Sequence, residues 1–445
     1  MNKLLIITLL LTISAVSAPG VAQAAEAPKI AAAQADTAGY DRFRFGGYGE
    51  MLAQFMDYGI NRFAGTSTGN TKTHRNSVSI PRFVVAFDYK FTPKWILGAE
   101  IEFEAGGVGS AVELENSENG EYETEIEKGG EVALEQFHIT RLIVPQFNVR
   151  AGHLIVPVGL TNAHHEPINF FGPSRPQAET SLLPSTWHET GIELFGSFGR
   201  RYTRFDYQVM VVAGLNANGF DRNEWVIGGK AGYFETDNFT SPGYVARIDY
   251  AGVPGLRTGV SFYYCRDTGS NSDKEHTYSA IGRIPVAIGT WDAQYSNRYV
   301  TARANLTYGY VGNSAALSEI NRMLSNKSPY SRLIPVAKNA LSYGVEAGVN
   351  LRSVIGNPCP VIYPFARYEY YNPQCRGEGR QIMDSRLEVS QWQVGLNWFA
   401  LPNLVVKGSY INRQIGTAKV FGKGPYNSEN EFQIGIAYIG WFVRN

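Results

Sequence analysis

Several features that would assign this chain to other protein classes are scarce or missing. Its 445 residues include only three cysteines, Cys265, Cys359 and Cys375, which are too few for a disulfide scaffold. After the N-terminal segment, no apolar run approaches the length of a membrane-spanning helix. Acidic and basic residues balance at 40 each, so the net charge gives no support for binding nucleic acid. The sequence thus favours neither a disulfide-rich protein, nor a helical membrane protein, nor a nucleic-acid-binding protein.

The first 24 residues have the features of a cleaved signal peptide. Lys3 gives a short basic start, residues 4–15 form an apolar run, and Ala22-Gln23-Ala24 fits a small-residue cleavage site. The apolar run is short for a spanning helix, so retention as an anchor is the less favoured alternative. We therefore predict export, a flexible alanine-rich lead-in over 25–41, and an ordered domain over 42–445.

Glycine and aromatic residues are abundant. The chain contains 47 glycines, 26 tyrosines and 24 phenylalanines, yet its mean hydropathy is −0.20. An exported chain that is rich in aromatics but polar on average is typical of a β-rich protein whose apolar residues alternate with polar ones. A secreted β-sandwich or propeller would share part of this composition, so the choice between these folds and a barrel depends on the pattern along the chain.

Alternation with a period of two residues recurs along the chain. In one run Val300, Ala302 and Leu306 alternate with Thr301 and Arg303. Clear runs occupy 43–55, 82–90, 94–104, 205–211, 244–250, 256–264, 300–308, 341–350, 391–398 and 431–442, and noisier ones 132–142, 146–157, 187–197, 285–295, 360–371 and 403–412. This pattern predicts about sixteen strands, each long enough to cross a bilayer when tilted.

The connections between these runs alternate between short and long. Short ones lie at 91–93, 144–146, 252–255, 296–297 and 401–403, and long ones at 57–76, 105–130, 158–186, 215–243, 266–284, 312–339, 372–386 and 413–430. Transmembrane β-barrels have tight periplasmic turns and longer external loops. We therefore predict an all-β, antiparallel transmembrane barrel of about 16 strands. Helical spacing of apolar residues within 313–340 predicts one short helix in an external loop.

Charged residues fall on one face of most predicted strands and apolar residues on the other. About sixteen strands enclose a water-filled channel, in which inward charges stay solvated. The candidate channel-lining residues are Arg44, Glu50, Arg82, Asp88, Lys90, Glu100, Glu102, Arg150, Arg247, Arg257, Arg303, Glu346, Arg367, Glu369 and Lys407.

The third long loop, 158–186, is a candidate constriction folded into the channel. It is rich in proline, and its candidate polar lining residues are His164, His165, Glu166 and Arg175. His164, His165 and Glu166 together with His188 also suggest a metal site. Adjacent histidines on an extended chain point in opposite directions, however, so we predict no metal here. Packing and hydrogen bonding that hold the loop against the wall are the favoured role.

Several segments resemble the phosphate-selective porin O/P family of Gram-negative outer membranes. They are FGGYGE at 45–50, LIVPVGLTNAHHEPINFFGPSRP at 154–176, TWHETGIELFG at 186–196, PGLRTGVSFYY at 254–264 and PFARYEYYN at 364–372. The resemblance implies a sixteen-stranded barrel, commonly trimeric, that passes small anions or other small solutes. Phosphate-selective members are expected to have a basic ladder through the lumen, whereas here comparable numbers of acids face the bases. The C-terminus also departs from the family, because Val443, Arg444 and Asn445 follow the last aromatic residue.

The sequence therefore predicts a passive diffusion porin in the outer membrane. Its partners would be the lipid bilayer, small hydrophilic solutes or ions, anions such as phosphate among them, and two further copies in a homotrimer. We expect no cofactor and no enzymatic activity, since no phosphate-cradling glycine motif or zinc-ligand spacing occurs. Two alternatives stay open. One is a barrel enzyme resembling an outer-membrane phospholipase or protease, with His138 as a base, and the other is a structural or adhesive barrel plugged by its own loops.

Overall fold

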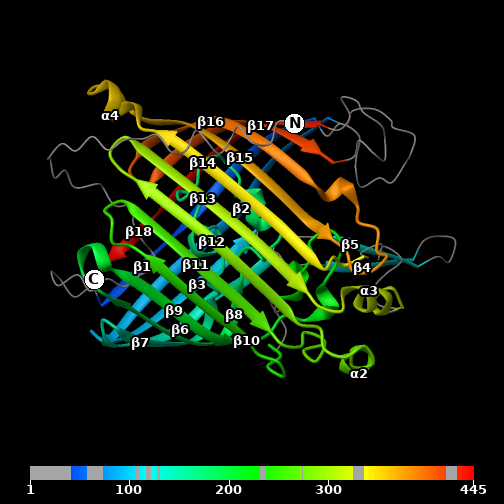
Figure 1. The fold of residues 1–445 in the computed structure, drawn as a ribbon. Coiled ribbons are helices and arrows are strands. Elements are labelled where there is room, and N and C mark those ends of the chain that lie inside the picture. The colour runs from blue at the N-terminus through cyan, green and yellow to red at the C-terminus, as the bar shows by residue number, and fades with distance from the viewer. Residues whose placement is uncertain are drawn as a thin grey trace.

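Sixteen antiparallel strands close into one barrel in a computed structural model of the chain (Figure 1). The structure describes residues 42–57, 74–105, 111–116, 122–127, 131–230, 237–272, 274–323, 335–416 and 428–444. The predicted signal peptide and the lead-in over 25–41 lie outside these residues. The closed barrel confirms the fold predicted from the alternation.

Strand order in the barrel follows the sequence, and the last strand pairs with the first. The barrel strands are β1 (Phe43–Asp57), β2 (His74–Thr92), β3 (Trp95–Glu104), β6 (Glu131–Val144), β7 (Phe147–Ile155), β8 (His188–Phe198), β9 (Phe205–Val212), β10 (Gly243–Tyr250), β11 (Leu256–Cys265), β12 (Val286–Ser296), β13 (Val300–Val311), β14 (Asn339–Val349), β15 (Val361–Arg376), β16 (Val389–Leu401), β17 (Leu404–Ile415) and β18 (Ser428–Arg444). Tyr48 of β1 lies opposite Ile439 of β18, so the barrel has no free edge strand.

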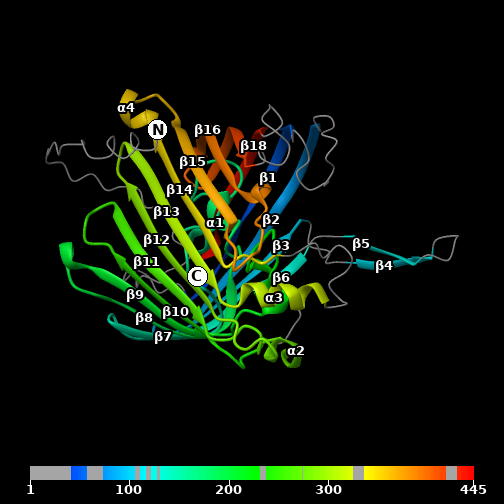
Figure 2. The ribbon, with the colours of Figure 1, turned by 45° about the vertical axis from the view of Figure 1, so that its right-hand side comes forward.

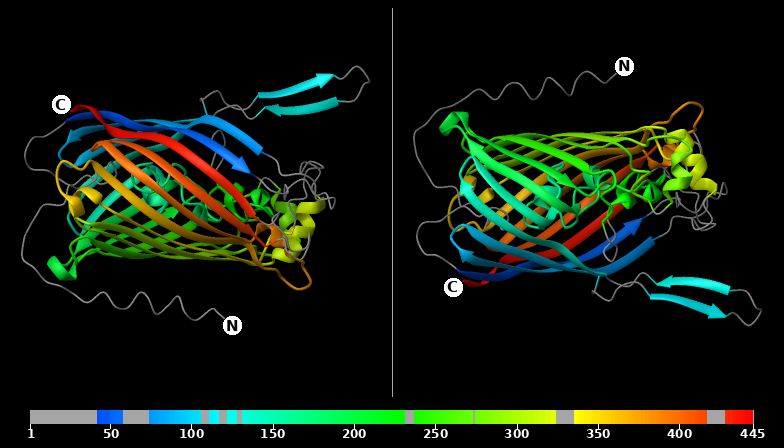
Figure 3. Two further views of the ribbon diagram at one scale, coloured as in Figure 1. Left: turned by 90° about the horizontal axis from the view of Figure 1, so that it is seen from above. Right: turned by 90° about the horizontal axis from the view of Figure 1, so that it is seen from below.

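The two ends of the barrel differ in the length of their connections. Helices α2 (Glu275–Ser279) and α3 (Ser314–Met323) and a hairpin of β4 (Ala111–Asn116) and β5 (Tyr122–Glu127) lie at one end, as Figure 3 shows. The C-terminus and α4 (Leu351–Ile355) lie at the other end, among mostly tight turns. Helix α3 confirms the predicted loop helix. Short 3₁₀ turns are η2 (Asn162–His164), η3 (Arg201–Thr203), η4 (Ala217–Gly219), η5 (Ile227–Gly229) and η6 (Ser385–Leu387).

The outer face of the barrel is apolar and exposed. On β16, the side chains of Trp392, Val394 and Leu396 are exposed, whereas the alternating Gln391 and Gln393 are buried inside the barrel. An exposed apolar face on a closed barrel is suited to lipid, which cannot satisfy polar groups. Among the described residues, no helix has the length and apolar character needed to cross a bilayer.

An apolar core fills part of the barrel interior, with residues from β7 and from β9 to β17. It joins inward residues of the wall, such as Met210, Val286 and Ile288, to residues of the long connections, such as Phe220 and Trp225. The outward Trp291 is exposed on the same strand as Val286 and Ile288. The run at 285–295 is therefore noisy because both faces of its strand carry apolar residues.

Candidate functional site

The connection between β7 and β8, residues 156–187, lies inside the barrel and is here called the inward loop. Ile155 and His188 are paired across the two strands, so the loop leaves the wall and returns to it at one place. It contains η2 and a single helical turn, α1 (Gln177–Thr180), which Figure 2 shows within the ring of strands. The loop has the position expected for 158–186, although it is not without secondary structure.

One side of the inward loop is held by apolar packing. Leu182, Leu183 and Trp187 are fully buried in the interior core, where the Trp187 ring lies 4.7 Å from that of Tyr263. The Asn162 amide holds the two ends of the loop together. Its Nδ2 donates to Val156 O at 2.6 Å, and its Oδ1 accepts from Trp187 N at 2.6 Å. The loop is thus a packed element of the fold.

Four cationic side chains of the wall donate to backbone carbonyls of the loop. Arg247 Nη1 reaches Gly159 O at 3.1 Å, and Arg82 Nη2 reaches His165 O at 3.2 Å. Arg367 Nη2 donates to Phe171 O. Lys407 Nζ contacts the carbonyls of Pro167, Phe170 and Gly172, the last two at 2.9 Å. These side chains come from β10, β2, β15 and β17, so the loop is held from widely separated parts of the wall.

Acidic wall residues complement these contacts by accepting from loop N–H groups. Glu369 Oε1 accepts from Ala178 N at 2.9 Å, and Glu346 Oε1 lies 3.5 Å from Phe171 N. The expectation that inward charges stay solvated is wrong for many of the candidates. Buried residues among them are Arg82, Glu100, Glu102, Arg247, Glu346, Arg367, Glu369 and Lys407. They are buried because the loop covers them, and their pairing with its backbone and with each other makes that burial tolerable.

Three of the remaining candidate arginines form ion pairs in which the arginine is the more exposed partner. Side-chain exposure is 24% for Arg150 against 2% for Glu193, 32% for Arg257 against 2% for Asp249, and 17% for Arg303 against 5% for Glu346. Nearer the tight turns, Arg44 and Asp88 pair with similar exposure, and Lys90 is partly exposed. Glu50 pairs with Arg82 at 2.9 Å. At Arg150, Arg257 and Arg303 the wall therefore presents guanidinium groups to the lumen and keeps their carboxylates beneath.

The four loop candidates have separate environments. His164 Nε2 lies 3.3 Å from Arg257 Nη1, whereas His165 Nε2 lies 3.1 Å from Glu135 of β6. Glu166 accepts from Asn169 within the loop at 2.6 Å. Arg175 donates to Ser185 Oγ at 2.6 Å and to Thr186 Oγ1 at 3.2 Å.

The histidines outside the loop have partners of their own. His188 Nδ1 lies 2.5 Å from His153 Nε2, and His138 Nδ1 lies 3.4 Å from Thr140 Oγ1. The structure thus does not gather His164, His165, Glu166 and His188 around one point.

A small cavity of about 30 Å³ lies between the inward loop and strands β12 to β15, which is room for one or two water molecules. Polar side chains dominate its lining, and they include His164, Asn169, Arg303, Glu346 and Arg367. The lining thus joins one loop candidate, His164, to four wall candidates around one space, namely Arg303, Glu346, Arg367 and Glu369.

Glu179 of α1 has a buried carboxylate that organises the loop backbone. It accepts from Leu160 N at 2.8 Å, Asn162 N at 2.9 Å and Asn305 Nδ2 at 3.2 Å. Burial raises the pKa of Glu179 to about 7, with Asp292 of β12 acting in the same direction, although the three N–H donors lower it. The raised pKa means that the folded barrel favours the protonated carboxyl.

This pKa predicts a pH dependence of stability. Because the folded pKa exceeds the unfolded one, the contribution of Glu179 is complete below about pH 4.5 and is lost as the pH rises through about 7, on the order of 3 kcal/mol in all. The melting temperature of the folded band in SDS gel electrophoresis, followed from pH 4.5 to 8, would measure it. We expect Glu179→Gln to flatten the wild-type decline, and an unchanged slope would contradict the assignment.

Gly348 of β14 makes room for the loop. A Cβ atom there would lie 2.5 Å from Cζ of Phe171, whose ring stacks on Phe365 at 5.2 Å. Gly348→Ala should therefore destabilise the barrel by about 1–3 kcal/mol through overpacking, lowering the same melting temperature. Gly289→Ala on β12 is the matched control, since nothing lies within 4 Å of its added Cβ. Equal effects of the two substitutions would show that the Phe171 contact is unimportant.

Some residues that matter here were not singled out from the sequence. Glu135, Glu193 and Asp292 pair with His165, Arg150 and Arg247 respectively. All three carboxylates occur in noisy runs, where polar residues at every second position are the available signal. Glu179 had no such signal, because it lies in the loop and two of its three partners are backbone groups of that loop.

Comparison with known proteins supports the fold. No protein-family model matches the chain. An uncharacterized protein of Aquifex aeolicus is 23% identical over 345 residues, covering 75% of this chain and 70% of that protein.

Two solved structures are similar in fold. The anion-selective porin from Comamonas acidovorans has a TM-score of 0.50 at 10% identity, covering 89% of this chain and 99% of its own. The outer-membrane channel DcaP of Acinetobacter baumannii has a TM-score of 0.49 at 11% identity, covering 89% and 97%. The closed sixteen-stranded barrel and its likeness to the Comamonas acidovorans structure show that the chain has the fold of outer-membrane β-barrel porins.

Proposed function

We propose that this protein is an outer-membrane porin through which small hydrophilic solutes diffuse passively, with a preference for inorganic anions such as phosphate. The proposal rests on how deeply the opposite charges are buried. The numbers of acids and bases are balanced, but Arg150, Arg257 and Arg303 are partly exposed inside the barrel and their carboxylate partners are buried. Ions in the lumen therefore meet guanidinium groups first.

Simple electrostatics indicates the size of this preference. A unit charge about 6 Å from an ion in water contributes roughly 0.7 kcal/mol, which is about a threefold change in occupancy. The carboxylates behind contribute less, because they are farther from the ion and are paired. A pore selects ions by sign where one sign dominates its narrowest part. The inward loop, whose His164 lies beside Arg257, is proposed to form that part.

The resemblance to the phosphate-selective porin O/P family and the similarity in fold to an anion-selective porin agree with this proposal. We further propose export through a cleaved signal peptide and assembly as a homotrimer, both by analogy with that family. We propose no enzymatic activity. A base such as His138 would need a nucleophile within about 2.6–3.2 Å, and the Thr140 hydroxyl lies 3.4 Å from His138 Nδ1.

A plugged structural or adhesive barrel is the competing function, and the apolar packing of the inward loop favours it. Purified protein in planar lipid bilayers separates the two. The porin proposal predicts stable, ohmic single-channel conductance in a symmetric salt solution. Correctly folded barrels that insert without conducting would overturn it in favour of the plugged barrel.

A further inference from the structure

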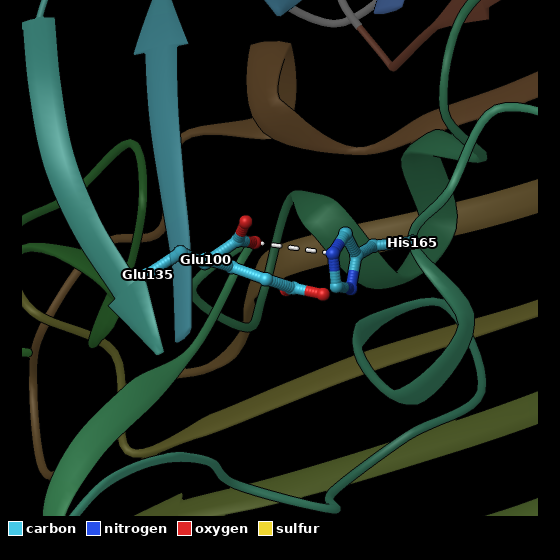
Figure 4. Close-up of side chains that lie close together, drawn as sticks. All are labelled: Glu100, Glu135 and His165. Atoms are coloured by element: carbon cyan, nitrogen blue, oxygen red, sulfur yellow. Dashed lines mark ion pairs between the residues drawn. The ribbon is translucent and has the colours of Figure 1, made fainter. Parts of the chain in front are cut away.

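Three side chains from different parts of the chain meet where the inward loop reaches the wall. They are Glu100 of β3, Glu135 of β6 and His165 of the loop, and one ligand atom from each lies within 4.8 Å of the others (Figure 4). His165 is 3% exposed, Glu135 0% and Glu100 9%. In Figure 4 both carboxylates point toward the imidazole ring.

The imidazole directs one particular nitrogen at the two carboxylates. His165 Nδ1 lies 3.1 Å from Asn162 O, and since a carbonyl only accepts, Nδ1 carries a hydrogen. The other nitrogen, Nε2, lies 3.1 Å from Glu135 Oε1, and neither atom makes a hydrogen bond of normal geometry among the described residues. A nitrogen lone pair and two carboxylates facing one another in a buried site require a cation between them, either a proton or a metal ion.

The surrounding charges favour the metal ion over the proton. Four buried or partly buried carboxylates lie in this region. Glu50 and Glu102 lie 2.9 and 4.0 Å from Arg82 Nε, and Glu100 and Glu135 lie against His165. A proton on His165 adds one positive charge to this site, whereas a divalent ion adds two.

Outer hydrogen bonds orient the three ligands as they do in metal sites. His165 donates Nδ1–H to a backbone carbonyl, Gln136 donates to Glu100 Oε2, and Tyr48 Oη lies 3.4 Å from Glu135 Oε2. We propose that Glu100, Glu135 and His165 bind a divalent first-row transition metal ion such as Zn²⁺. One imidazole and two carboxylates suit such an ion, whereas Ca²⁺ and Mg²⁺ prefer oxygen ligands alone. The ion would tie the inward loop to β3 and β6, a role that does not depend on conduction.

Zinc binding to the full-length barrel tests this site directly. The purified protein is dialysed against a chelator and titrated with ZnCl₂ by isothermal calorimetry. We expect one equivalent per protomer, with affinity lowered by more than about tenfold in His165→Ala and Glu135→Gln. His164→Ala is the matched control, because the neighbouring imidazole faces Arg257 instead, and it should bind zinc like the wild type.

Co²⁺ spectroscopy on the wild type keeps the test independent of how the variants fold. Co²⁺ at this site should give a visible absorption spectrum that one equivalent of Zn²⁺ abolishes. Absence of stoichiometric binding to the wild type, or equal binding by wild type and His165→Ala, would overturn the proposal and leave a proton-mediated ion pair.

Discussion

Lys407→Met should release the inward loop and raise the single-channel conductance. The three N–H donors of the Lys407 ammonium group are matched by three carbonyls, those of Pro167, Phe170 and Gly172. Methionine preserves most of the stem but leaves these carbonyls without a donor, and each buried unpaired acceptor costs about 1–3 kcal/mol. A loss of about 3 kcal/mol or more shifts the loop toward released states by over a hundredfold. Planar-bilayer recordings would show a larger and noisier current.

Lys338→Met is the control for this experiment. Lys338 pairs with Glu378 at 3.0 Å, and both side chains are about 30% exposed, so the same substitution removes a solvent-screened contact. It should leave conductance unchanged. If Lys407→Met barrels fold and conduct like the wild type, Lys407 is not what holds the loop in place.

Replacing Arg257 and Arg303 by glutamine should reduce or reverse the preference for anions. The carboxylates beneath them keep other partners, since Arg247 binds Asp249 and Arg367 binds Glu346. The variant therefore removes lumen-facing positive charge without freeing the buried acids. At roughly threefold per charge, the ratio of chloride to potassium permeability should fall by about tenfold at low salt, and by less at high salt because of screening.

Arg322→Gln is a control for the double variant, since it removes one arginine charge of the same kind at another place. Arg322 lies on the external helix α3, is 60% exposed and pairs with Glu319 within the helix. It should not change the permeability ratio. A double variant with wild-type selectivity would show that Arg257 and Arg303 do not face the ion path.

The barrel was predictable from the sequence because one strong constraint acts along its length. Lipid on one side and polar groups on the other impose alternation, as in the run containing Val300 and Arg303, and closure makes the first and last strands pair. Prediction was poorest where that constraint is absent. Val286 and Ile288 face an apolar core inside the barrel, so the period of two is blurred in their strand.

The contacts of the candidate site depend on how far along the barrel each side chain lies and on how the strands are aligned. The alternation of polar and apolar residues does not reveal either. The residues next to Lys407 in sequence indicate that its side chain faces inward. They do not indicate that three carbonyls more than 230 positions away would surround its ammonium group. Likewise, His164 and His165 are adjacent in sequence, yet one faces Arg257 and the other Glu135. Pairing of Arg150, Arg257 and Arg303 with deeper carboxylates is a property of the folded wall.

The difference in burial between these arginines and their carboxylate partners changes the ion selectivity that is expected of the channel. A count of inward acids and bases predicts weak discrimination, because the two are comparable in number. The exposed fractions instead separate them, with Arg257 at 32% and its partner Asp249 at 2%. Selectivity in this barrel is therefore proposed to depend on which charges are exposed to the lumen, and not on their total.

The reversal potential of the wild-type channel under a KCl gradient tests this account most directly. Chloride and potassium have similar mobility in water, so the sign of the potential reports the charge that ions meet in the pore. Exposed arginines over buried carboxylates predict a potential displaced toward the chloride equilibrium value, with a permeability ratio above one. A potential displaced toward the potassium value would contradict the proposed role of Arg150, Arg257 and Arg303.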